Sequence, residues 1–450
     1  MTKTTKHALD LIAFYLPQFH ATPENDEWWG KGFTEWTNVR KAKPNFPNHL
    51  QPFEPGELGY YNLLDPKVQV AQAELAKTYG IRGFCYYAYW FEGRRMLEKP
   101  LDLMLANRDV DIDFCVCWAN ENWTRRWDGC DEEILIGQPH TLEQDKRFIH
   151  DMLKYMQDPR YIRVNNRPLL LVYRPDILAE PKATVAYWKQ VVRDAGLGEL
   201  NACCVEFYGV ENPKDFGFDT MVEFPPHKSL LNENALSPPP TVTNSDFKGA
   251  ILDYVKVRNW FMRKPIAKGF TRYRGVMPRW DNTARRQDTS HIFYGSDPQL
   301  FRDWIYWDGM ETMLTQPPGE RLLFINAWNE WGEGCTLEPD KLYGRTYLQA
   351  AASALLALDD KAIIIDEYRA ALAKAEPLLS SQDLTAVREI ILSYERDILA
   401  ILKMFRHEDK LPAEVANLSA AYFFRTTPFG TLTRAYVARL TDAVRRRLTG

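Results

Sequence analysis

The stretch Arg321-Leu-Leu-Phe-Ile-Asn-Ala-Trp-Asn-Glu-Trp-Gly-Glu-Gly334 (RLLFINAWNEWGEG) joins a short apolar run to a loop with two glutamates three residues apart. The apolar run is typical of a buried β-strand, and the loop is rich in Trp, Asn and Gly. Seven similar runs precede it in the chain. The stretch therefore predicts the last strand of a repeating α/β fold, with acidic residues where that strand ends.

Eight such runs, with helical segments between most of them, define the expected fold. The runs lie at residues 11–19, 82–90, 112–120, 168–174, 202–208, 219–225, 272–280 and 321–329, and the clearest helical segments at 66–80, 141–157, 184–196 and 298–314. Alternating strands and helices imply parallel strands, and eight of them fit a (β/α)8 TIM barrel. A doubly wound sheet is the structural alternative. Only about ten residues separate the fifth and sixth runs, so a short, irregular crossover is expected there.

The chain changes character near residue 358. Residues 1–357 are expected to form the barrel, and residues 358–450 a helical C-terminal extension without strands. An apolar stripe over residues 384–405 predicts either a coiled-coil seam with another chain or a helix packed on this one. Residues 431–450 form a basic amphipathic segment, which suits an anionic membrane, a partner or a solvated helix face.

Composition excludes several classes of function. The formal charge of −4 over 450 residues offers no field for nucleic acid. Phosphate-binding glycine loops and the HExxH and CxxC metal patterns are absent, so we expect neither a metal nor another cofactor. The seven cysteines lack disulfide spacing, and neither a signal-like segment nor an 18-residue apolar run is seen. A cytoplasmic location is the resulting expectation.

Polar and aromatic side chains gather where the predicted strands end. In a (β/α)8 barrel these ends meet at one face, where active sites are built. Aromatic faces stack on sugar C–H surfaces while amides and carboxylates bind hydroxyls, so the expected ligand is a glycan. The candidate sugar-binding residues are Trp28, Trp29, Trp36, Tyr87, Trp90, Trp118, Asn120, Glu121, Trp123, Glu206, Glu223, Trp280, Asp281, Trp328 and Asn329.

Glu330 and Glu333 are the candidate catalytic residues. Neighbouring tryptophans and the proximity of the two acids should raise one pKa, leaving one group protonated and one ionised near neutrality. Glycoside cleavage needs that division between a proton donor and a base or nucleophile. The alternative is that both are surface residues capping the next helix, and Glu338 is expected to be a cap or a loop brace.

Four motifs carry a family resemblance: AFYLPQFH, NDEWWGKGFTEWTNV, CWANENWTRRWDG and NAWNEWGEGCTLEPD, all within residues 12–340. Together they resemble the WbsX-like, glycoside hydrolase family 99-like proteins of bacterial polysaccharide gene clusters. The resemblance implies a metal-free (β/α)8 barrel and retaining cleavage of α-mannosidic bonds. It also implies that Glu330 deprotonates the sugar's 2-hydroxyl and that Glu333 is the acid/base. The family 99 motif has a histidine where this chain has Gly332.

Three functions follow as hypotheses. The first is a retaining glycoside hydrolase acting on α-mannosidic or α-rhamnosidic linkages of a bacterial surface polysaccharide, through a 1,2-anhydro sugar. The second is a glycosyltransferase or transglycosidase in lipopolysaccharide or O-antigen biosynthesis. The third is a non-catalytic glycan-binding protein. In each case the partner is an oligosaccharide or polysaccharide, with a possible membrane or protein contact through the basic C-terminal segment.

Overall fold

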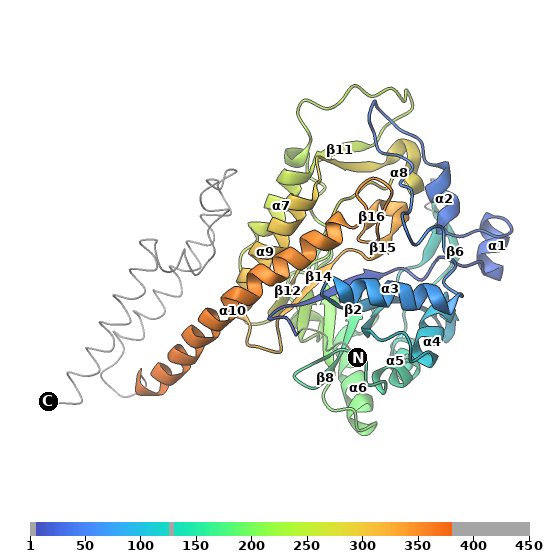
Figure 1. Ribbon diagram of the computed structural model, residues 1–450. Helices are drawn as coiled ribbons and strands as arrows, with labels where there is room; N and C mark the ends of the chain where they lie inside the picture. The colour runs from blue at the N-terminus through green and yellow to red at the C-terminus, as the bar shows by residue number, and fades with distance from the viewer. Residues whose placement is uncertain (1–5, 126–129, 380–450) are drawn as a thin grey trace, which may run out of the picture. The chain divides into compact units, whose positions relative to one another are not determined.

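The computed structural model describes residues 6–125 and 130–379, and eight parallel strands close into a barrel (Figure 1). These strands are β1 (Asp10–Tyr15), β2 (Ile81–Phe91), β4 (Asp113–Trp118), β8 (Arg167–Val172), β9 (Asn201–Val205), β10 (Thr220–Val222), β12 (Thr271–Val276) and β14 (Leu322–Ile325). Each strand pairs with its neighbours in chain order, and β1 pairs with both β2 and β14. Because that pairing closes the sheet, the (β/α)8 prediction is confirmed and the doubly wound alternative is excluded.

Helices cover the outside of the barrel between most strands. The larger ones are α3 (Pro66–Thr78), α4 (Lys99–Ala106), α5 (Leu142–Met156), α6 (Pro181–Asp194), α7 (Tyr254–Met262) and α9 (Pro298–Thr315). The chain starts several of them with a side-chain cap: Asp65, Thr141 and Asp297 each accept a backbone N–H of the first turn. Between β9 and β10 there is only the 3-10 turn η3 (Pro213–Phe216), as the short spacing predicts.

The loops between the barrel strands contain short helices, 3-10 turns and short strands. Short helices are α1 (Pro23–Trp29), α2 (Glu35–Lys41) and α8 (Thr283–Arg286), with 3-10 turns η2 (Pro175–Ile177), η4 (Asn232–Asn234), η5 (Gln287–Thr289) and η6 (Trp331–Glu333). Short strands are β3 (Arg94–Met96), β5 (Trp123–Arg125), β6 (Cys130–Ile136), β7 (Arg163–Val164), β11 (Ala250–Asp253), β13 (His291–Tyr294), β15 (Asn329–Glu330) and β16 (Cys335–Thr336). Of these, α1, α2, α8, β5, β15 and η6 each supply residues of the site described below.

The barrel strands are buried on both faces, as parallel strands covered by helices should be. All four residues of β14 and all five of β9 are buried. Cys85, Cys115 and Cys117 lie in this core as free thiols, together with Cys203 and Cys204. Buried free cysteines of this kind pack as small apolar residues.

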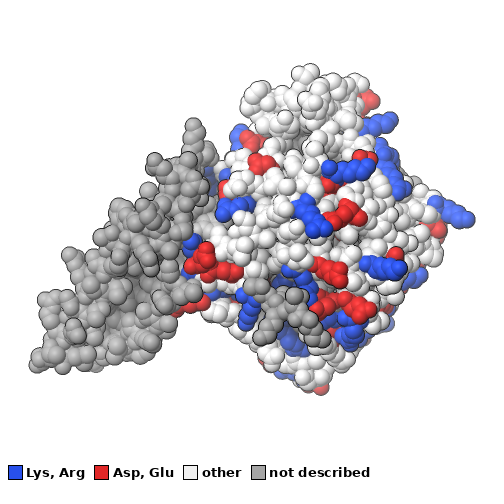
Figure 2. Space-filling model, viewed as in Figure 1, with Lys and Arg blue, Asp and Glu red and all other residues white. Residues whose placement is uncertain are grey.

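The chain divides into two compact units, residues 1–354 and 355–450, and of the second only residues 355–379 are described. Helix α10 (Thr346–Leu379) begins in the first unit and continues into the second. The stripe predicted over residues 384–405 and the basic segment 431–450 lie outside the described residues. Among the helices that are described, none has both the length and the apolarity needed to cross a bilayer. On the face shown in Figure 2, basic and acidic side chains are interspersed over the described surface, as a near-neutral chain predicts.

Candidate active site

The loop after β14 is folded tightly enough to fix both candidate acids. Strands β15 and β16 pair antiparallel, with Glu330 opposite Cys335, and η6 forms the turn between them. Gly334 ends the turn in the left-handed conformation, with φ of 59°, which suits glycine. The turn therefore holds Glu330 at its start and Glu333 at its end, both at the carboxyl-terminal face of the barrel.

The side chain of Arg285, from α8, binds three carboxylates at once. Its Nε lies 2.8 Å from Glu35 Oε1, its Nη2 lies 2.7 Å from Glu330 Oε2, and its Nη1 lies 2.8 Å from Glu333 Oε1. Glu35 is fully buried, Glu330 is 6% exposed and Glu333 is 22% exposed at the side chain. Three acids around one cation leave the cluster with more negative than positive charge if all are ionised.

Burial and the excess of negative charge both raise the pKa values of Glu330 and Glu333. Burial is the main reason that the pKa of Glu330 rises to about 8, and the charges of Glu333 and Glu35 add to it, while Arg285 opposes the rise. Burial likewise raises the pKa of Glu333, against the pull of Arg285. The pair can thus retain a proton near neutrality, as paired acids in a low-dielectric site do.

A pocket of about 1300 Å³, counting the part open to solvent, lies over these acids. Its walls come from the loops after six of the barrel strands and from the end of β2. Lining residues from the candidate set are Trp29, Tyr87, Glu121, Trp123, Trp280, Glu330 and Glu333; the others are Leu16, Gln18, Asn25, Tyr89, Ala119, Asn122, Thr124, Leu135, Tyr173, Phe224, His227, Asn282, Arg285 and Arg286. Aromatic rings, amides and acids together make a surface suited to sugar rings and their hydroxyls.

The comparisons with known proteins point to one family. The family model described as Glycosyltransferase WbsX matches residues 11–351. This chain belongs to that family. The WbsX-like resemblance carried by the four sequence motifs is thereby confirmed, and the match covers every strand of the barrel apart from the first residue of β1.

Curated relatives of this WbsX chain include proteins from Xanthomonas campestris pv. campestris. An "Uncharacterized protein WxcX" from strain ATCC 33913 is 45% identical over 358 residues, covering 78% of this chain and 50% of its own length. The homologue from strain B100 is 44% identical with the same coverage. The chain thus spans about half the length of the curated relatives it matches.

Solved structures align with this chain at low sequence identity. A "Glycoside hydrolase-like protein" aligns with a TM-score of 0.50 and 14% identity, over 78% of this chain and 94% of its own. A GH99 endo-alpha-mannosidase from Bacteroides thetaiotaomicron aligns over 78% of this chain and 98% of its own, with 15% identity and a TM-score of 0.46. At these identities, the first alignment supports the barrel fold alone, and the second adds no further argument.

Several predicted sugar-binding aromatics of the WbsX chain pack in the core instead of lining the pocket. Trp118 stacks on Phe148 with centroids 4.2 Å apart, and Trp90 donates its indole N–H to Asp151. Trp36 donates its indole N–H to the Tyr61 carbonyl, and Trp328 is fully buried. Trp28 is half-buried and makes an edge contact with Trp123 at 5.7 Å, without lining the pocket itself. Strand ends alone do not separate rings that face the barrel mouth from rings that turn outward.

Two predicted asparagines brace the loops. The Asn329 amide accepts the Leu16 N–H at 2.7 Å and donates to the Leu16 carbonyl at 3.0 Å. The Asn120 amide does the same for the backbone of Arg174, at 2.8 Å in both directions. Each side chain thus joins two neighbouring strand ends by mimicking a β-ladder pair, which leaves neither of them lining the pocket.

Glu206 and Glu223 belong to an ion network inside the barrel wall. Glu206 pairs with Lys264 at 2.9 Å, and the fully buried Glu223 pairs with Arg274 at 2.7 Å. Burial alone would raise the pKa of Glu223, but Arg274 and Lys264, with Arg272, hold that pKa below its usual value. These carboxylates form ion pairs with buried cations and do not line the pocket.

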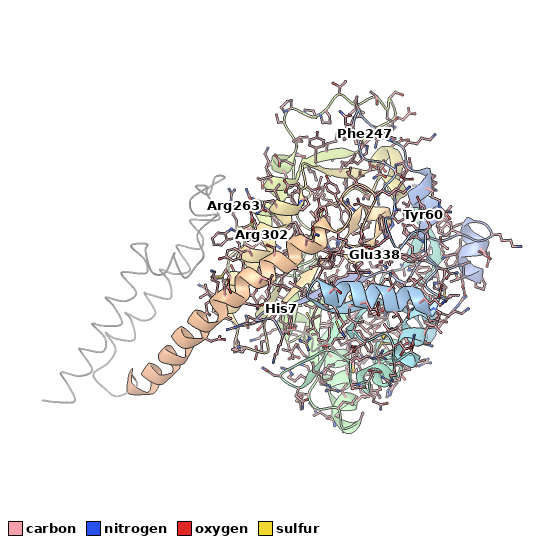
Figure 3. The ribbon with its side chains drawn as sticks, viewed as in Figure 1. His7, Tyr60, Phe247, Arg263, Arg302 and Glu338 are labelled. Carbon is pink, nitrogen blue, oxygen red and sulfur yellow. The ribbon has the colours of Figure 1, made fainter. Side chains whose placement is uncertain are left out.

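Asp281 and Glu338 lie beside the site as supports. Asp281 accepts hydrogen bonds from His49 Nε2 and Gln51 Nε2 and from the backbone N–H and hydroxyl of Thr283. Glu338, labelled in Figure 3, accepts from Tyr61, Gln72 and the indole of Trp331, and burial raises its pKa to about 7. The expectation that Glu338 braces its loop agrees with these contacts, whereas Asp281, a predicted sugar ligand, has its carboxylate fully engaged by protein groups.

Sequence reasoning missed Arg285 and the pairing role of Glu35. Arg285 lies five residues beyond Trp280, past the end of the predicted seventh strand, and Glu35 is 298 positions before Glu333 in the chain. One signal was present: acids grouped at a barrel mouth need a cation, because buried carboxylates are rarely left unpaired. The adjacent arginines 285 and 286, after the seventh strand, were the available source.

Proposed function

We propose that this WbsX chain cleaves α-mannosidic or α-rhamnosidic linkages of a bacterial surface polysaccharide or its precursor, with retention of configuration. The observation that carries the proposal is that Glu330 and Glu333 share the guanidinium of Arg285 beneath a pocket walled with aromatic rings. Such a pair, with raised pKa values, can supply both a proton and a base.

Glu330 is assigned as the base toward the sugar's 2-hydroxyl, and Glu333 as the acid/base at the glycosidic oxygen. Burial raises the pKa of Glu330 to about 8 in the sugar-free protein, so this assignment requires the proton held there to be on Glu333 when the reaction begins. This assignment follows the family resemblance of the NEW-x-EG motif. It is also supported by exposure, because the Glu333 side chain is 22% exposed and the Glu330 side chain only 6%. The more accessible acid is better placed to reach a departing oxygen and, later, a water molecule.

The reaction balances in two steps. First, Glu330 takes the 2-hydroxyl proton, the 2-oxygen bonds to C1, and the C1–oxygen bond breaks as Glu333 gives its proton to the leaving oxygen. Then Glu333 takes a proton from water, whose oxygen bonds to C1 and opens the 1,2-anhydro ring, while Glu330 returns its proton to the 2-oxygen. The 2-hydroxyl must be anti to the leaving group, which α-mannosides and α-rhamnosides satisfy.

The test compares oligosaccharides with an aryl α-mannoside that has a strongly acidic phenol as its leaving group. Glu333→Gln should lose about a hundredfold or more on oligosaccharides and far less on the aryl substrate, because the phenolate departs without a proton. Glu330→Gln should lose activity on both. Glu180→Gln, at an exposed glutamate that does not line the pocket, is the matched control. Release of the β-anomer first, or full activity in both variants, would contradict the proposal.

A glycosyl transfer reaction is the second candidate, because the matching family model is described as Glycosyltransferase WbsX. In the same pocket, a sugar hydroxyl would replace water in the second step and Glu333 would deprotonate it instead. Incubation with an oligosaccharide and a labelled acceptor sugar separates the two. A longer labelled product without new reducing ends supports transfer, and new reducing ends support hydrolysis. Binding without turnover of any tested glycoside would favour a glycan-binding protein.

A further inference from the structure

Gly332 lies where any side chain would collide with the ion pair behind the two acids. A Cβ at this position would stand 1.7 Å from Glu35 Oε1 and 2.8 Å from both Glu35 Cδ and Arg285 Nε. Contacts below 3.0 Å essentially do not occur for real Cβ atoms, and the obstructing groups are held by an ion pair. The backbone of the η6 turn thus leaves room for Glu35 and Arg285 only because residue 332 is a glycine.

Arg285 and the three carboxylates around it come from three separately anchored elements. Glu35 starts α2, where its backbone N–H donates to the Gln18 carbonyl at 3.1 Å. Arg285 lies on α8, whose first residue, Thr283, is bound by Asp281. Glu330 and Glu333 flank η6. Backbone hydrogen bonds join α2 to the residues after β1, and the Asp281 N–H before α8 to the Glu333 carbonyl at η6, so the guanidinium meets a preset arrangement.

A guanidinium suits this arrangement for a geometric reason. Its nitrogens lie in one plane and point in fixed directions, so each can bind a different carboxylate while the ring of acids stays in place. Lysine offers one compact charge and no such plane. The groups around Arg285 are Glu35 on α2, Glu330 and Glu333 around η6, and Tyr89 on β2; Arg286, the next residue on α8, acts on Glu333.

We propose that Arg285 is a positioning residue that fixes Glu330 and Glu333 relative to one another, and that Glu35 and Gly332 form the seat that holds it. Glu35 orients the guanidinium by binding its Nε, and the absence of a side chain at Gly332 leaves the space that the Glu35 carboxylate occupies. The inference rests on the proposed function only in treating Glu330 and Glu333 as the reacting acids. The arrangement itself concerns this chain's own carboxyl groups, whatever the glycan.

The experiment is a 13C NMR titration of protein labelled at the glutamate carboxyl carbons, with no substrate present. Glu330→Gln and Glu333→Gln spectra assign the two signals. In Arg285→Met, both titration midpoints should rise by about one pH unit or more, because a cation within hydrogen-bond distance is lost. Arg285→Lys should bring the midpoints part of the way back toward the parent values, because a positive charge is restored. The midpoints should differ more from one another than in the parent, because one ammonium cannot hold both acids in the parent geometry.

Gly332→Ala tests the seat while every charge is retained. Its methyl should displace Glu35 and, with it, Arg285, so the midpoints should move in the same direction as in Arg285→Met. Gly137→Ala is the matched control, because its Cβ would meet only Ile134 Cγ2, at an ordinary 3.9 Å. Circular dichroism confirms folding of each variant.

The outcomes are separable from those for the proposed function. Unchanged midpoints in folded Arg285→Met or Gly332→Ala protein would overturn the inference, even if the parent hydrolyses glycosides. Shifted midpoints would support it even if the parent proved to be a transferase. Where a substrate is found, the same variants should displace the pH profile of kcat in the direction of the NMR shift, which a merely structural role would not do.

Discussion

Asp281 donates its backbone N–H to the carbonyl oxygen of Glu333 at 2.7 Å, which joins the loop after β12 to the loop after β14. The Asp281 carboxylate also accepts hydrogen bonds from His49 and Gln51, and from Thr283 at the start of α8. One residue thereby supports both the turn that carries the acids and the helix that carries Arg285. The Asp281 carboxylate thus binds protein groups, whereas its position after the seventh predicted strand suggests a sugar-binding residue.

Asp281→Ala should destabilise the protein by about 3 kcal/mol, because it leaves several buried donors without an acceptor. Urea denaturation followed by circular dichroism measures this. Asp246→Ala, at an exposed loop position, is the control and should change the free energy of unfolding by less than about 0.5 kcal/mol. A variant of Asp281 as stable as the control would show that the two loops are held together in another way.

Glu330 should make stability depend on pH. Its pKa in the folded protein is raised from 4.5 to about 8, so its favourable contribution is complete below pH 4.5 and is lost as the pH rises through 8. The stability of Glu330→Gln relative to the parent should therefore increase between pH 5 and pH 9, by at most about 1.4 kcal/mol per pH unit. Urea midpoints at several pH values test this, and a difference that stays constant with pH would contradict it.

Pocket aromatics and outer aromatics should differ in their effect on sugar binding. Trp29→Ala removes a ring from the pocket wall and should weaken oligosaccharide binding about tenfold, which corresponds to about 1.4 kcal/mol. Trp307→Ala, on the partly exposed helix α9 away from the pocket, should leave the dissociation constant unchanged. Isothermal titration calorimetry with the cleavage-impaired Glu333→Gln background measures both. Equal losses of affinity in the two variants would show that the sugar does not bind against Trp29.

The buried pair of Glu223 and Arg274 should behave as a unit. Arg274→Met leaves Glu223 and Asp308 buried without their cation, 2.7 and 3.2 Å from the lost nitrogens, and should cost about 3 to 5 kcal/mol. Adding Glu223→Gln to Arg274→Met should recover part of that loss, because one uncompensated charge is removed. Chemical denaturation of the two single variants and the double variant gives the coupling directly. Additive losses would mean that other cations of the network replace Arg274.

The sequence predicted the barrel because its strands are buried on both faces and so read as short apolar runs separated by helical segments. All eight runs overlap observed strands, and the length of the segment between the fifth and sixth runs was enough to predict the short crossover. The carboxylate pair at residues 330 and 333 was also visible, because both acids follow an apolar strand within one turn.

The direction of each side chain at the barrel mouth was decided only by the tertiary structure. Trp118 and Trp123 lie five residues apart, yet the first packs on Phe148 in the core and the second lines the pocket. The partners of buried charges were likewise hidden, because Arg285 and Glu35 are 250 positions apart in the chain. Local sequence determines which segments become strands through burial and periodicity; which polar groups meet depends on distances that exist only once the barrel has closed.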